Sequence, residues 1–397
     1  MYKRQLQNEL ARIRAERGLP WQILERQPPA GGPDDLTAAA LGAFNSVAEI
    51  DRLHRSLDEM WPYEALDFPP VSLEHARRLI ARYRPASDLF LMRLRQPTGE
   101  FRVGLDQGIV EDTSWVSAAL LIARIEVLEA IRAVQEGVPD KSIEPLSDLA
   151  RLVLRMERCP SLVAHLAAVD IRRWIVCGMR AAAMSDQANR NTHQLLFELS
   201  SADRRERQDG RLAWIGDRAA GMHAYEMVRA GEFLSLLSDE EYQALSDRRE
   251  TMDHALVVRR NVDQDQTYFL KTMRELIERT PQPYYERRVW LDETFEALDR
   301  DRAAPRFPSV AADLLLIGIT TAQQRLARGT ARSDAWHLAL AAAIEQPLTE
   351  PPTVNVETGE AFEVLIDGVL IDGVRIEVRG LHEDDYDLLP ILVRHEL

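Results

Sequence analysis

The sequence predicts a mainly α-helical fold: an array of antiparallel α-hairpins, solenoid-like or an irregular bundle, with a small antiparallel β segment at the C-terminal end. Apolar residues recur at helical spacing over most of the chain, and short Gly-, Pro- and Asp-rich turns separate these runs. After Pro347 the pattern changes to β-branched residues with turn dipeptides. We therefore expect a helix at residues 1–17, a Pro/Gly linker at 18–35, a helical domain at 36–346 and a β segment docked on it at 347–397.

The composition is that of a folded, acidic protein with a large core. Hydrophobic residues make up 46% of the 397 residues and charged residues 28%, which are ordinary values for a globular chain. The net charge of −15 repels phosphate backbones, so no nucleic-acid partner is expected. All but three of the basic residues are arginines, which pair well with carboxylates, so we expect many Arg–Asp/Glu contacts between helices.

The N-terminal part alternates helical runs with breaks. A polar helix with a narrow apolar stripe is expected at 5–17, and the segment "GLPWQILERQPPAGGPDD" that follows it is typical of an extended linker. Helical spacing returns at 38–53. Ser72 then has the position of an N-cap for a further helix, which we expect Pro85 to end.

The centre carries the clearest helical signals. Three helices with short turns between them are expected at about 113–136, 140–157 and 161–184, the arrangement of an α-hairpin array. Ser238 with Glu241 has the spacing of a capping box, and Asp263 has the position of an N-cap. The remaining helices are expected near 190–200, 202–230, 239–257, 264–279, 284–300, 308–328 and 332–345.

The C-terminal segment has the pattern of a small sheet. The run 357–360 reads as a hairpin turn, and Asp-Gly at 367–368 and 372–373 signals hairpin turns or bulges. Apolar and charged residues alternate over 374–379, so one face of that strand packs and the other meets water. The run 388–397 is a candidate last strand, which Pro390 places at an edge.

Motifs that carry catalysis or nucleotide binding are absent from the sequence, and weaker features remain. His223 and Glu226 lie three residues apart on a helix, the spacing used in di-metal bundles, but no second matching pair exists, so a surface or packed histidine is favoured. Asp263 and Asp265 form a D-x-D pattern, which at a helix start more simply favours the positive end of the helix dipole.

Other polar and aromatic features have equally ordinary explanations. The acidic run 382–387, "HEDDYD", offers oxygen ligands for a hard cation, but a solvated loop between strands is favoured. Phe362 and Tyr386 are the aromatic candidates for a carbohydrate-binding role of the β segment. The tryptophans within the helical stripes are expected in the core, although one or two of them are candidates for lining a ligand groove: Trp115, Trp174, Trp214, Trp290 and Trp336.

Two cysteines, Cys159 and Cys177, lie in neighbouring helices. They form no C-x-x-C pair, so a zinc or thioredoxin-type site is not indicated. Two buried thiols are the favoured interpretation. A disulfide is the alternative if the helices bring the two Cα atoms close enough.

Four stretches resemble a group of planctomycete proteins, in which a membrane helix precedes a long helical domain. The stretches are "LQNELARIRAERGLP", "LDQGIVEDTSWVSAALLIARIEVLEAIRAVQEG", "CPSLVAHLAAVDIRRWIVCGM" and "RNVDQDQTYFLKTMRELIERTPQPY". The resemblance implies a topology and supplies no catalytic residue. The opening "MYKRQ" looks like translated adaptor sequence, so we expect native sequence to begin near Leu6 and a membrane helix to precede it.

These observations favour a non-catalytic helical scaffold or protein-interaction domain, tethered on the extracytoplasmic side of a membrane. We expect a protein partner, and we assign no catalytic, cofactor-binding or metal-binding residue and no cofactor. The alternative is a hydrolase-like enzyme, cytoplasmic if no anchor exists, whose site assembles from scattered Asp, Glu and His side chains. Buried acids and histidines converging in one pocket would favour the enzyme, and a groove lined by apolar and arginine side chains would favour the binding domain.

Overall fold

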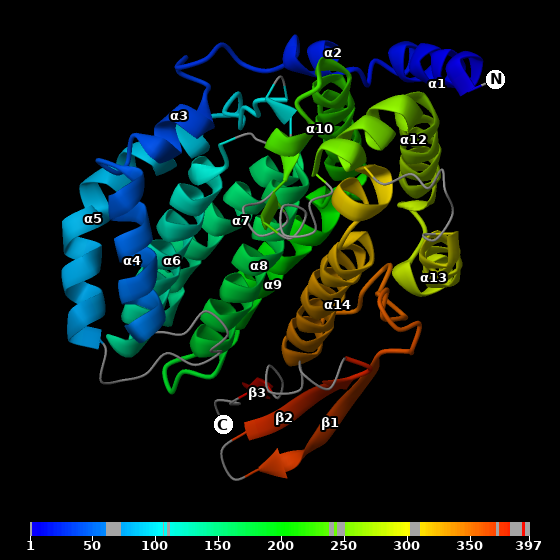
Figure 1. Ribbon diagram of the computed structural model, residues 1–397. Coiled ribbons are helices and arrows are strands. Elements are labelled where there is room, and N and C mark those ends of the chain that lie inside the picture. The colour runs from blue at the N-terminus through cyan, green and yellow to red at the C-terminus, as the bar shows by residue number, and fades with distance from the viewer. Residues whose placement is uncertain are drawn as a thin grey trace.

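The computed structural model confirms the predicted fold class, a mainly helical body with a small antiparallel sheet at the C-terminal end (Figure 1). The structure describes residues 2–60, 73–105, 107–108, 112–237, 242–243, 251–301, 310–370, 373–381 and 391–393. The capping box expected at Ser238 and Glu241 lies outside these residues, as do the acidic run 382–387 and Pro390.

Short and long helices alternate in the N-terminal part: α1 (Tyr2–Ala15), α2 (Pro20–Leu24), α3 (Leu36–Leu41), α4 (Val47–Met60) and α5 (Leu73–Leu94). The helix predicted at 38–53 is divided into α3 and α4. The predicted end at Pro85 is wrong, because α5 continues through this residue. Phe90 and Leu94, both 1% exposed, lie beyond the proline, and their burial outweighs its cost to the helix, about 3 kcal/mol.

The segment 18–35 differs from the extended linker that was expected. Leu19 and Ile23 are 3% and 7% exposed, and the Leu19 N–H donates to the side chain of Gln22 at the start of α2. Helix α1 packs along α12, with Leu6 and Ile13 buried in the contact. Apolar anchors at helical spacing therefore hold this segment on the body, despite its prolines and glycines. In the described part of the chain, no helix is long and apolar enough to cross a bilayer.

The central hairpins are confirmed: α6 (Ser114–Gln135), the short 3₁₀ helix η3 (Pro139–Ser142), α7 (Ile143–Glu157), α8 (Leu162–Ala183), α9 (Arg190–Glu206) and α10 (Arg211–Ala230). Helix α8 is buried on nearly all sides and packs against α6, α7, α9, α10 and α14, so it is the central element (Figure 1). The break between α9 and α10 lies at 207–210 rather than near 201, because Gly210 takes the left-handed conformation there.

The later elements in the described residues are η4 (Phe233–Leu236), α12 (Thr251–Arg279), α13 (Tyr284–Asp301), the π turn η5 (Ala311–Leu315) and α14 (Ile319–Ala343). Helix α12 is continuous, so Asp263 lies in its interior and the predicted cap is wrong. The break expected between residues 328 and 332 is wrong, because α14 continues across Gly329, while residues 311–315 of the helix expected at 308–328 form η5. A Cβ atom on Gly329 would lie 2.8 Å from a methyl group of Val169, so this glycine permits close packing of α14 on α8.

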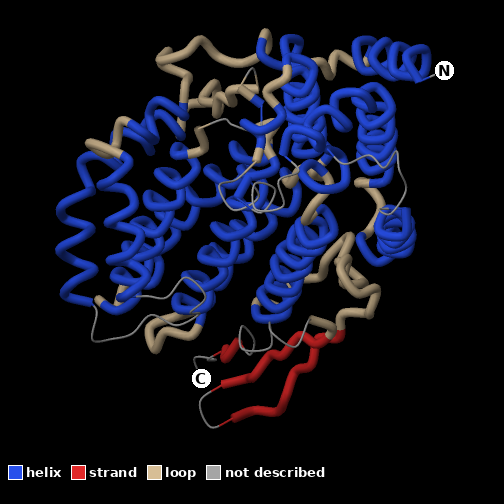
Figure 2. Tube along the Cα trace, in the orientation of Figure 1, coloured by secondary structure: helices blue, strands red, loops and turns tan. Residues whose placement is uncertain are grey.

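The sheet has three antiparallel strands in the order β1 (Glu363–Leu370), β2 (Gly373–Arg379) and β3 (Ile391–Val393) (Figure 2). Ile376 and Val378 are buried as the alternation predicts, and β2 packs against α14. The pairing register shifts between Asp367 and Val369, where the Asp-Gly signal predicted a turn or bulge. The sheet is thus docked on the helical body through its middle strand.

Candidate functional site

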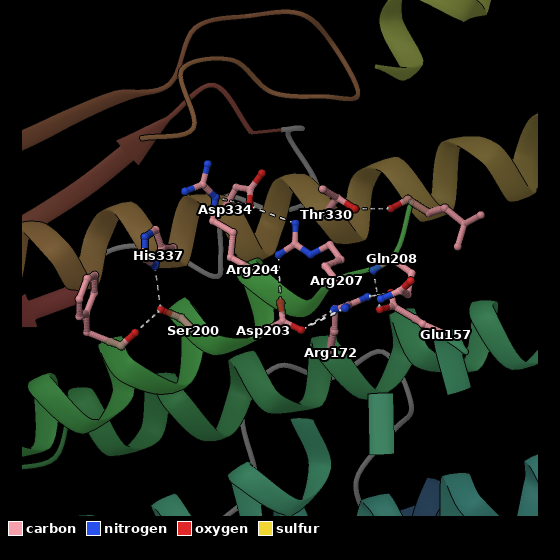
Figure 3. A network of polar contacts seen from close by, with 12 residues as sticks. Glu157, Arg172, Ser200, Asp203, Arg204, Arg207, Gln208, Thr330, Asp334 and His337 are labelled. Carbon is pink, nitrogen blue, oxygen red and sulfur yellow. Dashed lines mark hydrogen bonds and ion pairs between the residues drawn. The ribbon is translucent and has the colours of Figure 1, made fainter. Parts of the chain in front are cut away.

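A network of largely buried charges joins α7, α8, α9 and α14 (Figure 3). Arg172 on α8 pairs with Glu157 on α7 and with Asp203 on α9. Arg207, just after α9, lies 3.0 Å from Asp203 and 3.1 Å from Asp334 on α14. Because charges removed from water are costly unless they are paired, this chain of alternating charges fixes how α7, α8, α9 and α14 pack.

The electrostatics of this network follow from its pairing. The side chains of Arg172 and Asp203 are 6% and 12% exposed. Burial works against both charges, but Arg172 and Arg207 outweigh it at Asp203 and lower the pKa of that carboxyl to about 2. The partner carboxylates likewise raise the pKa of Arg172. Asp203 and Arg172 are therefore both ionised at neutral pH, which suits a structural role and not proton transfer.

A cavity of about 220 Å³ adjoins this network, and we call it the junction cavity. The end of α7, α8, the α9–α10 turn, α10, the α12–α13 turn, α13 and α14 contribute to its wall. Glu157 and His165 lie there as a candidate acid–base pair. However, Glu157 accepts from Arg172 and from the Gln208 N–H, and His165 Nε2 lies 3.1 Å from the Cys159 carbonyl oxygen. Both side chains are thus engaged in holding the fold.

Three other buried side chains of the junction cavity have polar atoms that lack hydrogen-bond partners among the described residues. Arg287 is 6% exposed, and among the described residues no carboxylate lies within ion-pair distance of it. Its Nη1 donates to the Thr280 carbonyl at 2.5 Å, while its Nε has no partner in this part of the chain. Within the same described part, the indole Nε1 of Trp214 and both amide atoms of Gln323 also lack partners, although both residues are 0% exposed.

A second cavity, of about 420 Å³, lies on another face of α14, between α14 and α8. Among the described residues that line it, four are arginines and one is an acid, Asp170. We call it the arginine groove and define it by its cations: Arg173 on α8 and Arg325, Arg328 and Arg332 on α14. Positions 325, 328 and 332 share one face of the helix.

Carboxylates hold part of the arginine groove in place. Arg325 Nη2 lies 2.5 Å from an oxygen of Asp170, and its side chain remains 46% exposed. Arg328 donates from Nε and Nη2 to Glu357 at 3.2 and 3.1 Å. Each guanidinium has five N–H donors in a planar fork, and the paired carboxylate fixes the orientation of that fork.

The predicted metal-site candidates have structural roles. His223 packs against Gly108, and Glu226 points to solvent. Asp263 pairs with Arg229 at 2.8 Å. Asp265, 2% exposed, accepts from the Tyr225 hydroxyl and from the N–H groups that start η5. In the described ranges, no three His, Cys, Asp or Glu side chains are placed to hold a metal ion.

The tryptophans are mostly core residues, as predicted. Trp115, Trp174 and Trp336 are at most 2% exposed, and Trp214 is fully buried. Trp290 is half-buried; it donates to Glu275 and lies under the Arg279 guanidinium at 5.1 Å. Of the two aromatic candidates in the β segment, Phe362 is half-buried against the core, and Tyr386 lies outside the described residues.

Sequence reasoning missed Arg287, Gln323 and the arginine groove. Polar residues scattered along amphipathic helices normally face solvent, so nothing in the local pattern marks these side chains as buried or convergent. The three arginines of α14 share a helical face, which is the one signal that the sequence offered. No family model, no curated protein and no solved structure matches this chain.

Proposed function

We propose that the chain is a non-catalytic interaction domain that binds an acidic segment of a partner protein in the arginine groove. The observation that carries this proposal is the gathering of four guanidinium groups along one groove of a protein whose net charge is −15. Guanidinium forks bind carboxylates in a bidentate way, which selects for Asp and Glu side chains. The rest of the acidic surface repels such a segment, so binding would concentrate at the groove.

The alternative, a hydrolase-like enzyme, has less support. Its best candidate pair is Glu157 and His165 in the junction cavity, and burial lowers the pKa of His165. The Glu157 carboxylate accepts hydrogen bonds from Arg172 and from the Gln208 N–H. Among the described residues, it accepts none from a nucleophilic side chain. The membrane tether, the extracytoplasmic location and the planctomycete kinship remain predictions.

The proposal is tested by binding of short fluorescent peptides, measured by anisotropy. A peptide of alternating Glu and Ala should bind, and a matched Lys/Ala peptide should not. The double variant Arg173→Gln/Arg325→Gln should weaken binding ~10-fold or more, since two charge-assisted contacts are lost. Added salt should also weaken binding, because the contacts are partly exposed.

Arg82→Gln is the matched control, since its side chain is 69% exposed on the distant helix α5. It should leave peptide affinity unchanged within about twofold. Equal binding of the acidic and basic peptides, or equal affinity of wild type and the double variant, would reject the groove as the site. Turnover of ester or amide substrates by the wild-type chain would instead support the enzyme alternative.

A further inference from the structure

One buried arginine at the junction cavity, Arg287, lacks a carboxylate partner among the described residues. The other two arginines of this cavity, Arg172 and Arg207, pair with Glu157, Asp203 and Asp334, and Asp209 pairs with Arg211 at 2.6 Å. Arg287 has no such partner among the described residues, and its contacts are the Thr280 carbonyl and the Tyr284 ring. Burying an unpaired charge is costly, so a bound anion would remove a penalty that the ligand-free protein carries.

The unsatisfied polar atoms at this cavity are mostly donors. Arg287 Nε, Trp214 Nε1 and Gln323 Nε2 are N–H groups without a partner in the described part of the chain, and Gln323 Oε1 is the one acceptor beside them. An unsatisfied buried donor destabilises the folded state, and several around one cavity indicate a missing acceptor-rich group. A carboxylate offers two oxygens and about four acceptor positions.

Size and wall chemistry limit the rest of the ligand. A cavity of about 220 Å³ lies below the usual range for drug-sized ligands, so it fits a small molecule and excludes a folded partner. Val169, Leu326, Ala327 and Val356 give the wall an apolar part. The Glu157 carboxylate at the same cavity repels a second negative charge. Together these features favour a monoanion with an apolar body.

We propose that the junction cavity binds a small monocarboxylic acid, such as a short-chain or aromatic acid, with its carboxylate on Arg287, Trp214 and Gln323. This site is separate from the arginine groove, and the two proposals stand or fall independently. Burial lowers the pKa of Arg287 to about 10, which leaves the guanidinium charged at neutral pH. A bound carboxylate would favour the charged form further.

The first test uses the wild-type chain and calorimetric titration with benzoate, butyrate, benzamide and inorganic phosphate. Benzoate or butyrate should bind, and benzamide, which has the same shape without the charge, should bind ~10-fold more weakly or not at all. Equal binding of benzoate and benzamide would overturn the proposal, as would absence of binding by both acids. Tighter binding of phosphate than of either acid would also overturn the monocarboxylate assignment.

Variants then locate the site. Arg287→Gln should weaken benzoate binding ~10-fold or more, and Gln323→Leu should weaken it to a smaller extent. Arg288→Gln is the matched control, because this neighbouring side chain on α13 is 65% exposed and pairs with Asp292. Circular dichroism verifies that each variant is folded. If Arg287→Gln does not fold, Gln323→Leu and the acid–amide comparison still decide; unchanged benzoate affinity in folded Arg287→Gln would reject the site.

Discussion

Arg172 and Asp203 are joined by two hydrogen bonds, in which Nε and Nη2 of the arginine donate to the same oxygen, Oδ1, at 3.1 and 3.0 Å. The pair ties α8 to α9 in the interior. Removing the charge in Asp203→Asn should lower the free energy of unfolding by about 3 kcal/mol, at the low end for a buried pair, because Arg172 keeps Glu157 and Arg207 keeps Asp334. Urea denaturation at neutral pH measures this change.

The matched control is Asp209→Asn, because Asp209 forms a partly exposed pair with Arg211 and should contribute at most about 1 kcal/mol. A similar effect of the two variants would contradict the structural role of the network. The pH dependence provides a second check. Because the pKa of Asp203 is lowered from 3.8 to about 2, its stabilisation is present above pH 3.8 and is lost as the pH falls through 2, and Asp203→Asn should not show this loss.

Glu126 should make the protein less stable as the pH rises. This side chain on α6 is 1% exposed, and burial raises its pKa from 4.5 to about 7, although Arg84 lies 3.5 Å away. Between about pH 4.5 and pH 7, Glu126 binds a proton more readily in the folded state than in the unfolded state, so the free energy of unfolding falls with rising pH. Glu126→Gln should therefore match wild type near pH 4 and exceed its free energy of unfolding by about 3 kcal/mol at pH 8.

The control for this prediction is Glu129→Gln, one turn further along α6. The hydrogen bond from Arg132 lowers the pKa of Glu129, so its removal should give no gain at high pH. Thermal unfolding followed across the pH range compares the three proteins. A gain for Glu126→Gln that is the same at pH 4 and pH 8 would show that ionisation is not its cause.

Gly216 should be much less tolerant of alanine than Gly178. A Cβ atom on Gly216 would lie 1.8 Å from the Pro160 carbonyl oxygen, so α10 could not keep its contact with the turn before α8. At Gly178 the nearest atom, at 2.6 Å, is the end of the Leu146 side chain, which can move. We expect a loss of about 3 kcal/mol for Gly216→Ala and about 1 kcal/mol for Gly178→Ala. Chemical denaturation measures the loss of unfolding free energy in each variant. Equal losses for Gly216→Ala and Gly178→Ala would contradict this packing.

The sequence predicts the elements whose signals are local. The two successive hairpins formed by α6, α7 and α8 follow from apolar spacing with turns at Gly137 and Pro160. Strand β2 follows from the strict alternation of apolar and charged residues. The prediction from local signals fails at Pro85 and Gly329, where long-range packing outweighs a local helix breaker. Both errors have the same cause, because a window of neighbouring residues does not show which side chains become buried against distant parts of the chain.

The candidate sites could not be predicted for the same reason. Trp214, Arg287 and Gln323 come from α10, α13 and α14, and they are separated by dozens of positions in the chain. Each has an ordinary neighbourhood in its own helix, and only the packing of the three helices makes one cavity of them. The arginine groove is a partial exception, because three of its four cations recur on one helical face.

Cys159 and Cys177 should react slowly with a thiol reagent in the folded protein. They are 1% and 3% exposed and are not joined in a disulfide, which confirms the favoured prediction of two buried thiols. Burial keeps the reagent away from both thiols. Titration with Ellman's reagent should therefore detect little thiol in the native chain and both cysteines after denaturation without reductant. Rapid labelling of the native chain would contradict their burial, and absence of labelling after denaturation would indicate a disulfide.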